Sequence, residues 1–318
     1  MTGGGYQGEH SNRQTADLAP SRCRPRVPGL RGAGARAGAY ARAMPGRLIL
    51  CAGPIGNLGD APARLAEELA GADMVYAEDT RRSGVLLRHL GVRRPLRSYF
   101  AGNEEQRAME MRERLDAGET VALVTDAGTP SISDPGLSAV RAALDAGADV
   151  SVIPGPSAVT AALAVSGLPA DRFVFEGFLP RSGGRRRDRL GELAAEHRTI
   201  VLFCAPGRLG GDLADLSASL GTGRRCAVCR ELTKLHEEVW RGTLGEAASH
   251  WADGGRGEVT VVVEGGTPAV ADVDTAAADV ERLIADGVPL SDAVRSVAEN
   301  TGVRRRTLYE RAIRRSGA

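Results

Sequence analysis

Four times between residues 47 and 166, a short apolar run leads into a loop and then into an amphipathic helix. The apolar runs span residues 48–52, 74–77, 120–124 and 150–153. Strands and helices that alternate in this way are typical of a parallel sheet, because each parallel connection must cross over the sheet and usually does so as a helix. Ligands of such sheets bind at the carboxyl ends of the strands, where we expect all four loops to lie.

The pattern changes after residue 167. Five short strands are predicted there, at residues 173–175, 199–203, 225–229, 237–241 and 258–263, with helices at about 187–197, 207–219 and 244–251. Two of these strands lie close together around Lys234, which indicates a mixed sheet. We therefore expect a two-domain α/β protein. It comprises an N-terminal domain with a Rossmann-like parallel sheet over residues 44–166, a mixed α/β/α domain over 167–268, and a helix-turn-helix-like helical segment over 269–318.

Composition and charge fit this architecture. The 318 residues are 42% apolar and 25% charged, as in ordinary globular proteins, which excludes a wholly disordered or membrane-spanning chain. The net charge of +1 hides an uneven distribution, since residues 1–43 carry +5, residues 304–318 carry +5 and the body between them carries −9. A basic end can bind an anionic polymer, whereas a uniformly basic coat is excluded. Residues 1–43 are rich in Arg, Gly and Pro, and we expect them to be a disordered extension.

The cysteines and the apolar segments indicate a cytoplasmic protein without a metal. Five cysteines, mostly within apolar runs, are typical of reduced thiols. Cys226 and Cys229 have the spacing of a metal or redox pair, but in a strand they face opposite sides and no second pair completes a zinc site. The uncharged stretch 150–170 is interrupted by Pro154 and Pro156, so we expect a buried strand and helix rather than a membrane span. Residues 1–43 lack the apolar core of a signal peptide.

Three of the loops, at residues 53–57, 126–130 and 154–158, are rich in glycine and proline. Loops of this kind let a flat adenosine and a charged, flexible tail approach the main chain closely. None of them matches the G-x-x-x-x-G-K-[ST] or G-x-G-x-x-G pattern, which argues against a Walker nucleotide site and a standard dinucleotide site. A single loop would be an ordinary turn, but three after consecutive strands favour a ligand site.

Seven segments carry a resemblance to a known family. They are residues 48–60, 77–81, 121–136, 153–158, 166–169, 175–180 and 230–237. In this order and at this spacing the sequence resembles the ribosomal RNA small subunit methyltransferase I family, a branch of the tetrapyrrole methylase superfamily. The resemblance implies a tetrapyrrole-methylase-like two-domain fold and a homodimer. It also implies methylation by S-adenosylmethionine of the ribose 2′-hydroxyl of a cytidine in 16S rRNA of the small ribosomal subunit.

The loops and the resemblance together predict a cofactor cleft between the two domains. We expect the cofactor to be bound by the loop residues Pro54, Gly56, Asp126, Gly128, Thr129, Gly155, Ser157 and Ala158, with Ala205 closing the cleft from the second domain. The sulfonium of S-adenosylmethionine is already activated, so the reaction requires no metal. No ligand set for a metal is predicted.

A ribose hydroxyl is a poor nucleophile, so its methylation needs a proton acceptor, strong positioning, or both. Glu78, Asp79, Glu231 and Lys234 are the candidates for the catalytic groups. Lys234 is the only lysine, and a desolvated lysine with a lowered pKa could act as the base. The ordinary alternative is an ion pair between Lys234 and Glu231 or Glu238. For Glu78 and Asp79 the alternative is two acids that complement a helix dipole.

Arginines are the candidates for holding RNA. Arg81 and Arg230 could bind phosphates bidentately, and Arg185, Arg186 and Arg187 form a second clamp in what is either a binding or a mobile loop. At the carboxyl end, Ala298, Gly302, Val303 and Leu308 have the layout of a helix-turn-helix whose second helix carries Arg304, Arg305, Arg306 and Arg311. Such a helix would grip the phosphate backbone. Alternatively, it is a solvated helix that closes the domain.

Two other functions stay open from the residues alone. A methyltransferase acting on a tetrapyrrole ring would share the fold and the cofactor, but it has no need for a basic helix-turn-helix. A DNA-binding regulator with a ligand-sensing α/β body would read a palindrome through a dimer, and its loops would bind an effector without chemistry. The segments 77–81 and 230–237 resemble the RNA branch.

Overall fold

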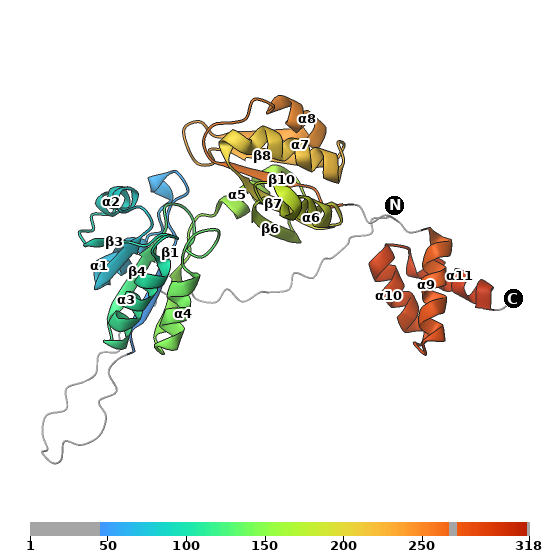
Figure 1. Ribbon diagram of the computed structural model, residues 1–318, viewed down its shortest axis with the longest axis horizontal. Helices are drawn as coiled ribbons and strands as arrows, with labels where there is room; N and C mark the ends of the chain where they lie inside the picture. The colour runs from blue at the N-terminus through green and yellow to red at the C-terminus, as the bar shows by residue number, and fades with distance from the viewer. Residues whose placement is uncertain (1–44, 267–271, 317–318) are drawn as a thin grey trace, which may run out of the picture. The chain divides into compact units, whose positions relative to one another are not determined.

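The computed structural model describes residues 45–266 and 272–316. The extension expected over residues 1–43 lies outside the described residues. Figure 1 shows two α/β regions and a group of three helices. No helix in the described part of the chain is both long and apolar enough to cross a membrane.

The first region is built on a parallel five-stranded sheet, as predicted. Its strands are β1 (Arg47–Cys51), β2 (Met74–Ala77), β3 (Leu96–Ser98), β4 (Thr120–Val124) and β5 (Asp149–Ile153), in the order β3-β2-β4-β1-β5. The sequence analysis missed β3, a three-residue edge strand without a buried side chain. Cys51 pairs with both Val124 and Ile153, and Ala77 pairs with Val124. This register brings the carboxyl ends of four strands level, so the loops that follow them lie together.

Helices cover both faces of this sheet (Figure 1). Helices α1 (Leu65–Gly71) and α2 (Thr80–His89) pack on one face, and α3 (Glu104–Asp116) and α4 (Leu137–Asp145) pack on the other. Successive strand residues alternate between the two cores, with Ile49 facing α1 and α2 and Leu48 facing α3 and α4. Both faces are therefore apolar, and the strands are continuous apolar runs. A short 3₁₀ turn, η1 (Leu58–Asp60), follows the loop after β1.

The second sheet is mixed, as predicted. It contains β6 (Phe173–Phe178), β7 (Thr199–Cys204), β8 (Arg225–Arg230), β9 (Glu238–Thr243) and β10 (Val259–Val263), in the order β6-β7-β10-β8-β9. Only the β6–β7 pair is parallel. Helices α6 (Gly183–Ala194), α7 (Leu209–Leu220) and α8 (Leu244–His250) cover one face, and the 3₁₀ turn η2 (Pro206–Arg208) precedes α7. Cys226 lies on this face and Cys229 on the other, so the two thiols point apart as expected.

Helix α5 (Ala158–Ser166) covers the other face of the second sheet. It follows β5 in the chain, yet its buried Val159, Ala162 and Leu163 share a core with Val201 and Ala227. We expected this helix to belong to the N-terminal domain over residues 44–166. In the structure it connects the two α/β regions by packing on the sheet that follows it.

The last three helices have a core of their own. They are α9 (Val273–Ala285), α10 (Leu290–Thr301) and α11 (Arg305–Ser316). Gly302 has a φ of 70° and ends α10 in the left-handed conformation that favours glycine. Val303 and Leu308 after it are buried. The predicted helix-turn-helix layout is confirmed for these residues.

Candidate active site

The loops after β1 and β4 are joined by backbone contacts. The Gly53 N–H donates to the Gly128 carbonyl at 2.8 Å. Gly128 has a φ of 73°, a conformation that side chains with a Cβ rarely adopt. In the third loop, a Cβ at Gly155 would lie within 3.2 Å of Ala52. The glycines therefore allow the three loops to approach one another and leave main-chain groups exposed beside them.

Two cavities adjoin at this edge of the first sheet. The larger has a volume of about 360 Å³ and is lined from both α/β regions by Ile55, Glu78, Arg82, Asp126, Ala127, Gly128, Thr129, Ile132, Ser133, Asp134, Ser157, Ala158, Val159, Phe178, Phe203, Cys204, Glu258, Val259 and Thr260. The smaller has a volume of about 330 Å³ and is lined by Pro54, Ile55, Gly56, Leu58, Arg82, Ser83, Val85, Leu86, Thr125, Asp126, Ala127, Lys234 and Glu258. Arg82, Asp126 and Glu258 border both cavities.

The structure brings most of the predicted cofactor residues to these cavities. Asp126, Gly128, Thr129, Ser157 and Ala158 line the larger one, and Pro54 and Gly56 line the smaller. The other two predicted residues line neither cavity. Gly155 packs against Ala52, and Ala205 borders a separate hollow, whereas its neighbour Cys204 lines the larger cavity.

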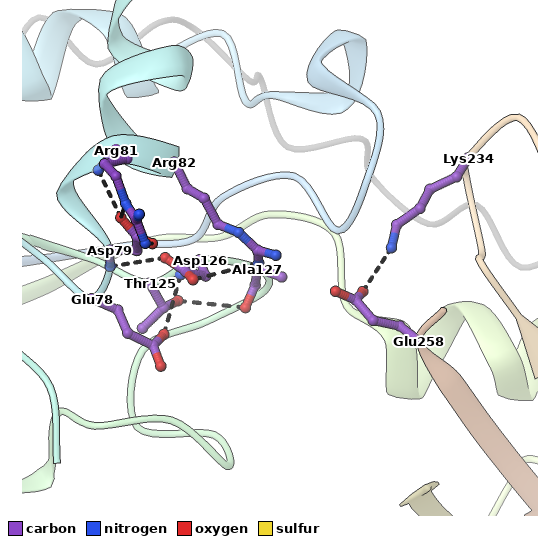
Figure 2. A network of polar contacts seen from close by, with 9 residues as sticks. All are labelled: Glu78, Asp79, Arg81, Arg82, Thr125, Asp126, Ala127, Lys234 and Glu258. Carbon is purple, nitrogen blue, oxygen red and sulfur yellow. Dashed lines mark hydrogen bonds and ion pairs between the residues drawn. The ribbon is translucent and has the colours of Figure 1, made fainter. Parts of the chain in front are cut away.

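Carboxylates crowd the wall of the larger cavity. Asp126 accepts hydrogen bonds from the Asp79 N–H at 2.9 Å and from Arg82 at 3.4 Å, and the Glu78 carboxylate accepts one from the Asp126 N–H at 3.3 Å (Figure 2). Burial raises the pKa of Glu78, and the charge of Asp126 adds to the rise. Burial raises the pKa of Asp126 as well. Glu78, a predicted catalytic residue, therefore has a higher proton affinity than an exposed carboxylate.

Asp134 is a site residue that the sequence analysis missed. It lines the larger cavity, and burial together with the charges of Glu78, Asp126 and Glu258 raises its pKa to about 7. No residue in the described part of the chain donates a hydrogen bond to its carboxylate. The preceding Ser133 has a φ of 62°, which is strained backbone of the kind found at functional sites. Its position within segment 121–136 was the one available signal, because neither its burial nor its neighbours can be seen in the sequence.

Asp79 and Arg81 are paired with each other. The Asp79 carboxylate caps α2 by accepting from the Arg81 N–H at 2.8 Å, and it also accepts from the Arg81 guanidinium at 2.9 Å. These bonds lower the pKa of Asp79 to about 2. Asp79 is therefore a poor proton acceptor beside Glu78. Arg81 is exposed and directed to solvent, where a phosphate could displace its partner.

Lys234 lies between two carboxylates. Its ammonium contacts Glu231 at 2.8 Å and Glu258 at 3.0 Å. Figure 2 shows the contact with Glu258. Partial burial lowers the pKa of Lys234, but the hydrogen bonds to both acids outweigh it and the pKa is raised. The expectation of a lowered pKa is wrong for this reason, and Lys234 is a cation in this structure. Gly56 lies directly against the lysine side chain, so a Cβ at this position would force the side chain to shift.

Glu231 is held as an anion in the same cluster. Its carboxylate accepts hydrogen bonds from Lys234 and from the Glu258 N–H at 2.8 Å, and these lower its pKa. Glu258, which the sequence analysis did not select, borders both cavities and pairs with Lys234. Glu238, the other partner considered for Lys234, instead pairs with Arg230 at 2.9 Å. The guanidinium of Arg230, a predicted phosphate ligand, is therefore bonded to a carboxylate.

The predicted clamp at residues 185–187 is helical and not a loop. α6 begins at Gly183, four residues earlier than expected, because Gly183 takes a positive φ and admits the turn. Arg186 is only 8% exposed and contacts Asp212 and Asp215, each at 2.7 Å. A buried, doubly paired guanidinium cannot grip RNA, so this role is withdrawn for Arg186. Arg185 and Arg187 are exposed and have no partner among the described residues.

The arginines in and just before α11 differ in whether an acidic side chain is bonded to them. Arg304, just before the helix, is exposed and has no partner in the described part of the chain. Arg305 pairs with Glu299 and Arg306 with Glu310, at 2.7 and 2.8 Å on the surface. Arg311 is bonded to Asp274 at the start of α9 and helps to hold the three helices together.

The chain is similar in sequence to known proteins over most of its length. Residues 47–248 match the sequence profile of the tetrapyrrole (corrin/porphyrin) methylases, and residues 271–316 match that of the RsmI C-terminal HTH domain. A protein of Mycobacterium tuberculosis named ribosomal RNA small subunit methyltransferase I is 50% identical over 272 residues, which cover 84% of this chain and 95% of the relative.

Two solved structures share the fold at lower identity. Diphthine synthase is 18% identical with a TM-score of 0.55, over 69% of this chain and 90% of its own. Uroporphyrin-III C-methyl transferase from Thermus thermophilus, complexed with S-adenyl homocysteine, is 20% identical with a TM-score of 0.50, over 68% of this chain and 96% of its own. The two solved structures show only the fold, whereas the two sequence profiles and the relative at 50% identity show the family. This chain belongs to the ribosomal RNA small subunit methyltransferase I family, within the tetrapyrrole (corrin/porphyrin) methylases.

Proposed function

We propose that this protein transfers a methyl group from S-adenosylmethionine to rRNA of the small ribosomal subunit, and that the acceptor is the ribose 2′-hydroxyl of a cytidine in 16S rRNA. The observation that carries the proposal is the pair of adjoining cavities. The larger has apolar and acidic walls suited to the cofactor and to proton removal, and the smaller adjoins it with Arg82, Asp126, Lys234 and Glu258 at its wall. We also propose that the protein acts in the cytoplasm as a homodimer.

The larger cavity fits the cofactor. Ile55, Phe203 and Val259 supply apolar surface for an adenine ring, and Gly128 leaves its backbone open to a tail. The carboxylates on the same wall compensate positive charge, and S-adenosylmethionine carries a sulfonium and an ammonium. When bound, the cofactor supplies an activated methyl group on cationic sulfur. The protein has only to place the acceptor oxygen and remove its proton.

Separate side chains of the protein are proposed to remove the proton and to place the acceptor. Glu78 and Asp134, whose pKa values are raised, can take the proton from the hydroxyl as the oxygen attacks. Lys234 stays protonated between Glu231 and Glu258 and can hold the acceptor or its phosphate by charge. Lys234 is thus proposed as a positioning residue and not as the base.

A tetrapyrrole acceptor is the second candidate, and the similarities weigh against it. The solved tetrapyrrole enzyme is 20% identical, whereas the relative named for ribosomal RNA is 50% identical. The C-terminal helix-turn-helix also has exposed arginines, which a porphyrin precursor does not require.

The test is transfer of tritiated methyl from S-adenosylmethionine to 30S subunits that lack the modification, with uroporphyrinogen and duplex DNA as parallel acceptors. We expect label in 16S rRNA only. A 2′-O-methyl group blocks alkaline cleavage at its own linkage, so the labelled nucleotide should be recovered as an alkali-resistant dinucleotide containing cytidine. Label recovered as a methylated base would contradict the ribose assignment, and label in uroporphyrinogen would favour the second candidate.

A further inference from the structure

An exposed aromatic ring lies at the mouth of the larger cavity. Phe178 ends β6, is 58% exposed and lines the cavity with Phe203, whose ring centre is 5.6 Å from its own. A single exposed ring is common on protein surfaces, so the significance of Phe178 depends on what surrounds it: a cavity wall, a neighbouring hollow and free arginines. One side of the ring contacts Phe203, and more than half of the residue is accessible to solvent.

A β-bulge directs Phe178 to this position. Phe175 pairs with Val201 and Phe178 with Phe203, so β6 holds one residue more than β7 between these pairs. Without the extra residue, Gly177 would occupy the place beside Phe203. Gly177 has a φ of 66°, and a Cβ there would lie 3.3 Å from the Ser133 hydroxyl. The local backbone is therefore arranged to present a ring beside the cavity.

A second hollow continues from the same ring. Phe178, Leu179, Arg181, Ala205, Arg208 and Asp212 line it, and its volume is about 550 Å³. Arg208 donates to the Arg181 carbonyl and Arg186 to the Pro180 carbonyl, both at 2.9 Å, so the backbone at residues 180–181 is held from two sides. The Arg181 side chain is exposed and has no partner among the described residues.

The charge around this hollow is positive. Among the described residues that line this hollow, Asp212 is the one acid, and it is already bonded to Arg186 and Arg208. Arg185 and Arg187 on α6 add two exposed, unpaired cations to the same segment of chain. An open aromatic face beside free guanidinium groups is the arrangement that binds single-stranded nucleic acid, in which bases stack on rings and arginines contact phosphates.

We propose that Phe178 and Arg181 form a subsite for the nucleotide adjacent to the methylated one, with Phe178 stacking on its base and Arg181 binding its phosphate. The subsite rests on the proposed function, because the acceptor ribose must reach the neighbouring cavity. A nucleotide drawn into that cavity leaves the base beside it unstacked, and Phe178 replaces the lost neighbour. Neither Phe178 nor Arg181 was among the RNA ligands predicted from the sequence.

The experiment measures RNA affinity separately from turnover. Full-length Phe178→Ala, Phe178→Trp and Arg181→Gln variants are titrated with a short single-stranded oligocytidylate and with unmodified 30S subunits, at several salt concentrations. Phe173→Leu, at the other end of β6, and Arg93→Gln, which is exposed and has no partner among the described residues, are the matched controls. Calorimetry with S-adenosylmethionine alone reports on the cofactor site and on folding.

We expect Phe178→Ala to weaken oligocytidylate binding by about 5- to 100-fold and Phe178→Trp to retain it. Arg181→Gln should lower the salt slope by about 0.7, the value for one phosphate contact on a single strand. Both controls should keep wild-type affinities, and Phe178→Ala, which also borders the cofactor cavity, should lose much less cofactor affinity than RNA affinity. Unchanged RNA affinity of Phe178→Ala would overturn the subsite. A loss of cofactor affinity as large as the loss of RNA affinity would also overturn it, because Phe178 would then be a wall of the cofactor site.

The outcomes separate this subsite from the proposed function. If the wild-type protein methylates 30S subunits and Phe178→Ala binds RNA equally well, the function stands and the subsite is wrong. If Phe178 governs oligocytidylate binding but the wild-type protein methylates no RNA, the subsite stands and the proposed function is wrong.

Discussion

Two groups of acids lie at the cavities or next to them, and they differ in the charges that face them. Glu231 and Glu258 share the ammonium of Lys234. Glu78, Asp126 and Asp134 lie on the wall of the larger cavity, where Arg82 is the one cation that the described part of the chain contributes. The pKa of Glu231 is lowered by its lysine, while burial and mutual repulsion raise the pKa values of the other group. Whether an acid has a cationic partner therefore decides, more than its place at the cavities, whether it can take a proton.

The difference assigns separate tasks to the two groups. A carboxylate that is already neutralised by a cation fixes that cation in place. A partly desolvated carboxylate without a partner gains from a bound cation and can accept a proton near neutral pH. The wall with Glu78 and Asp134 is thus suited to a cationic cofactor and to proton removal, and the Lys234 group is suited to positioning.

The largest effect is expected from removing the proton acceptor. Glu78→Gln keeps the shape of the side chain and should lower kcat by about 10²- to 10⁴-fold, the usual contribution of a general base. Asp79→Asn is the matched control one residue away, since Arg81 already holds that carboxylate. Single-turnover methyl transfer to 30S subunits measures both. Equal losses in the two variants would show that pairing does not separate the acids.

The next effect concerns the loop that carries Asp126. Gly128→Val places a β-branched residue at a φ of 73° and a side chain toward the cavity, so cofactor affinity should fall by at least about tenfold. Gly223→Val, which faces open space at an ordinary φ, is the control. Calorimetry gives the affinity, and melting temperature reports any loss of fold. Wild-type affinity in Gly128→Val would remove this loop from the cofactor site.

Removing the ammonium of Lys234 should leave Glu231 and Glu258 without their shared cation. Lys234→Ala removes the cation that faces Glu231, which should raise the pKa of Glu231, and it should slow methyl transfer by roughly 10- to 100-fold through lost positioning. RNA and cofactor affinity should change little, and Lys234→Met tests the charge with the stem retained. The kcat and KM of each variant are compared. A rise in KM with an unchanged kcat would show that Lys234 contributes only to substrate binding.

The smallest effect is expected at the carboxyl end. Replacing Arg304, Arg305 and Arg306 by Gln should weaken RNA binding and reduce its salt slope by about 0.7 to 0.9 per lost phosphate contact. Arg304 should contribute most, because Arg305 and Arg306 must first leave surface acids. Filter binding to 30S subunits at several salt concentrations measures the slope. A wild-type slope in the triple variant would make the helix-turn-helix a structural cap.

The fold was largely predictable, because apolar runs and Gly/Pro loops mark buried parallel strands directly. The three-residue strand β3 escaped detection because none of its side chains is buried. The start of α6 was misplaced because Gly183 and Gly184 resemble a loop, although they form its first turn.

The site was less predictable, since its chemistry depends on which charged groups meet. Glu78 and Lys234 could be selected from the sequence, but the separate roles proposed for them could not, because Lys234 pairs with Glu258, which lies just before β10 and far along the chain. Asp134 and Phe178 owe their character to burial and to a bulge, neither of which has a local sequence pattern. Arg186 looked free in an arginine run and is buried between Asp212 and Asp215.

Proton release on cofactor binding tests most directly whether the unpaired carboxylates receive the cationic cofactor. With a pKa of about 7, Asp134 is about half protonated at pH 7, and a sulfonium beside it favours the charged form. Binding should therefore release a fraction of a proton, and affinity should rise as the pH increases through about 7. Calorimetry in two buffers of different ionisation enthalpy measures this. We predict proton release with S-adenosylmethionine, less with S-adenosylhomocysteine, which lacks the sulfonium charge, and none in Asp134→Asn. Equal proton release with both ligands, or release that persists in Asp134→Asn, would contradict the account.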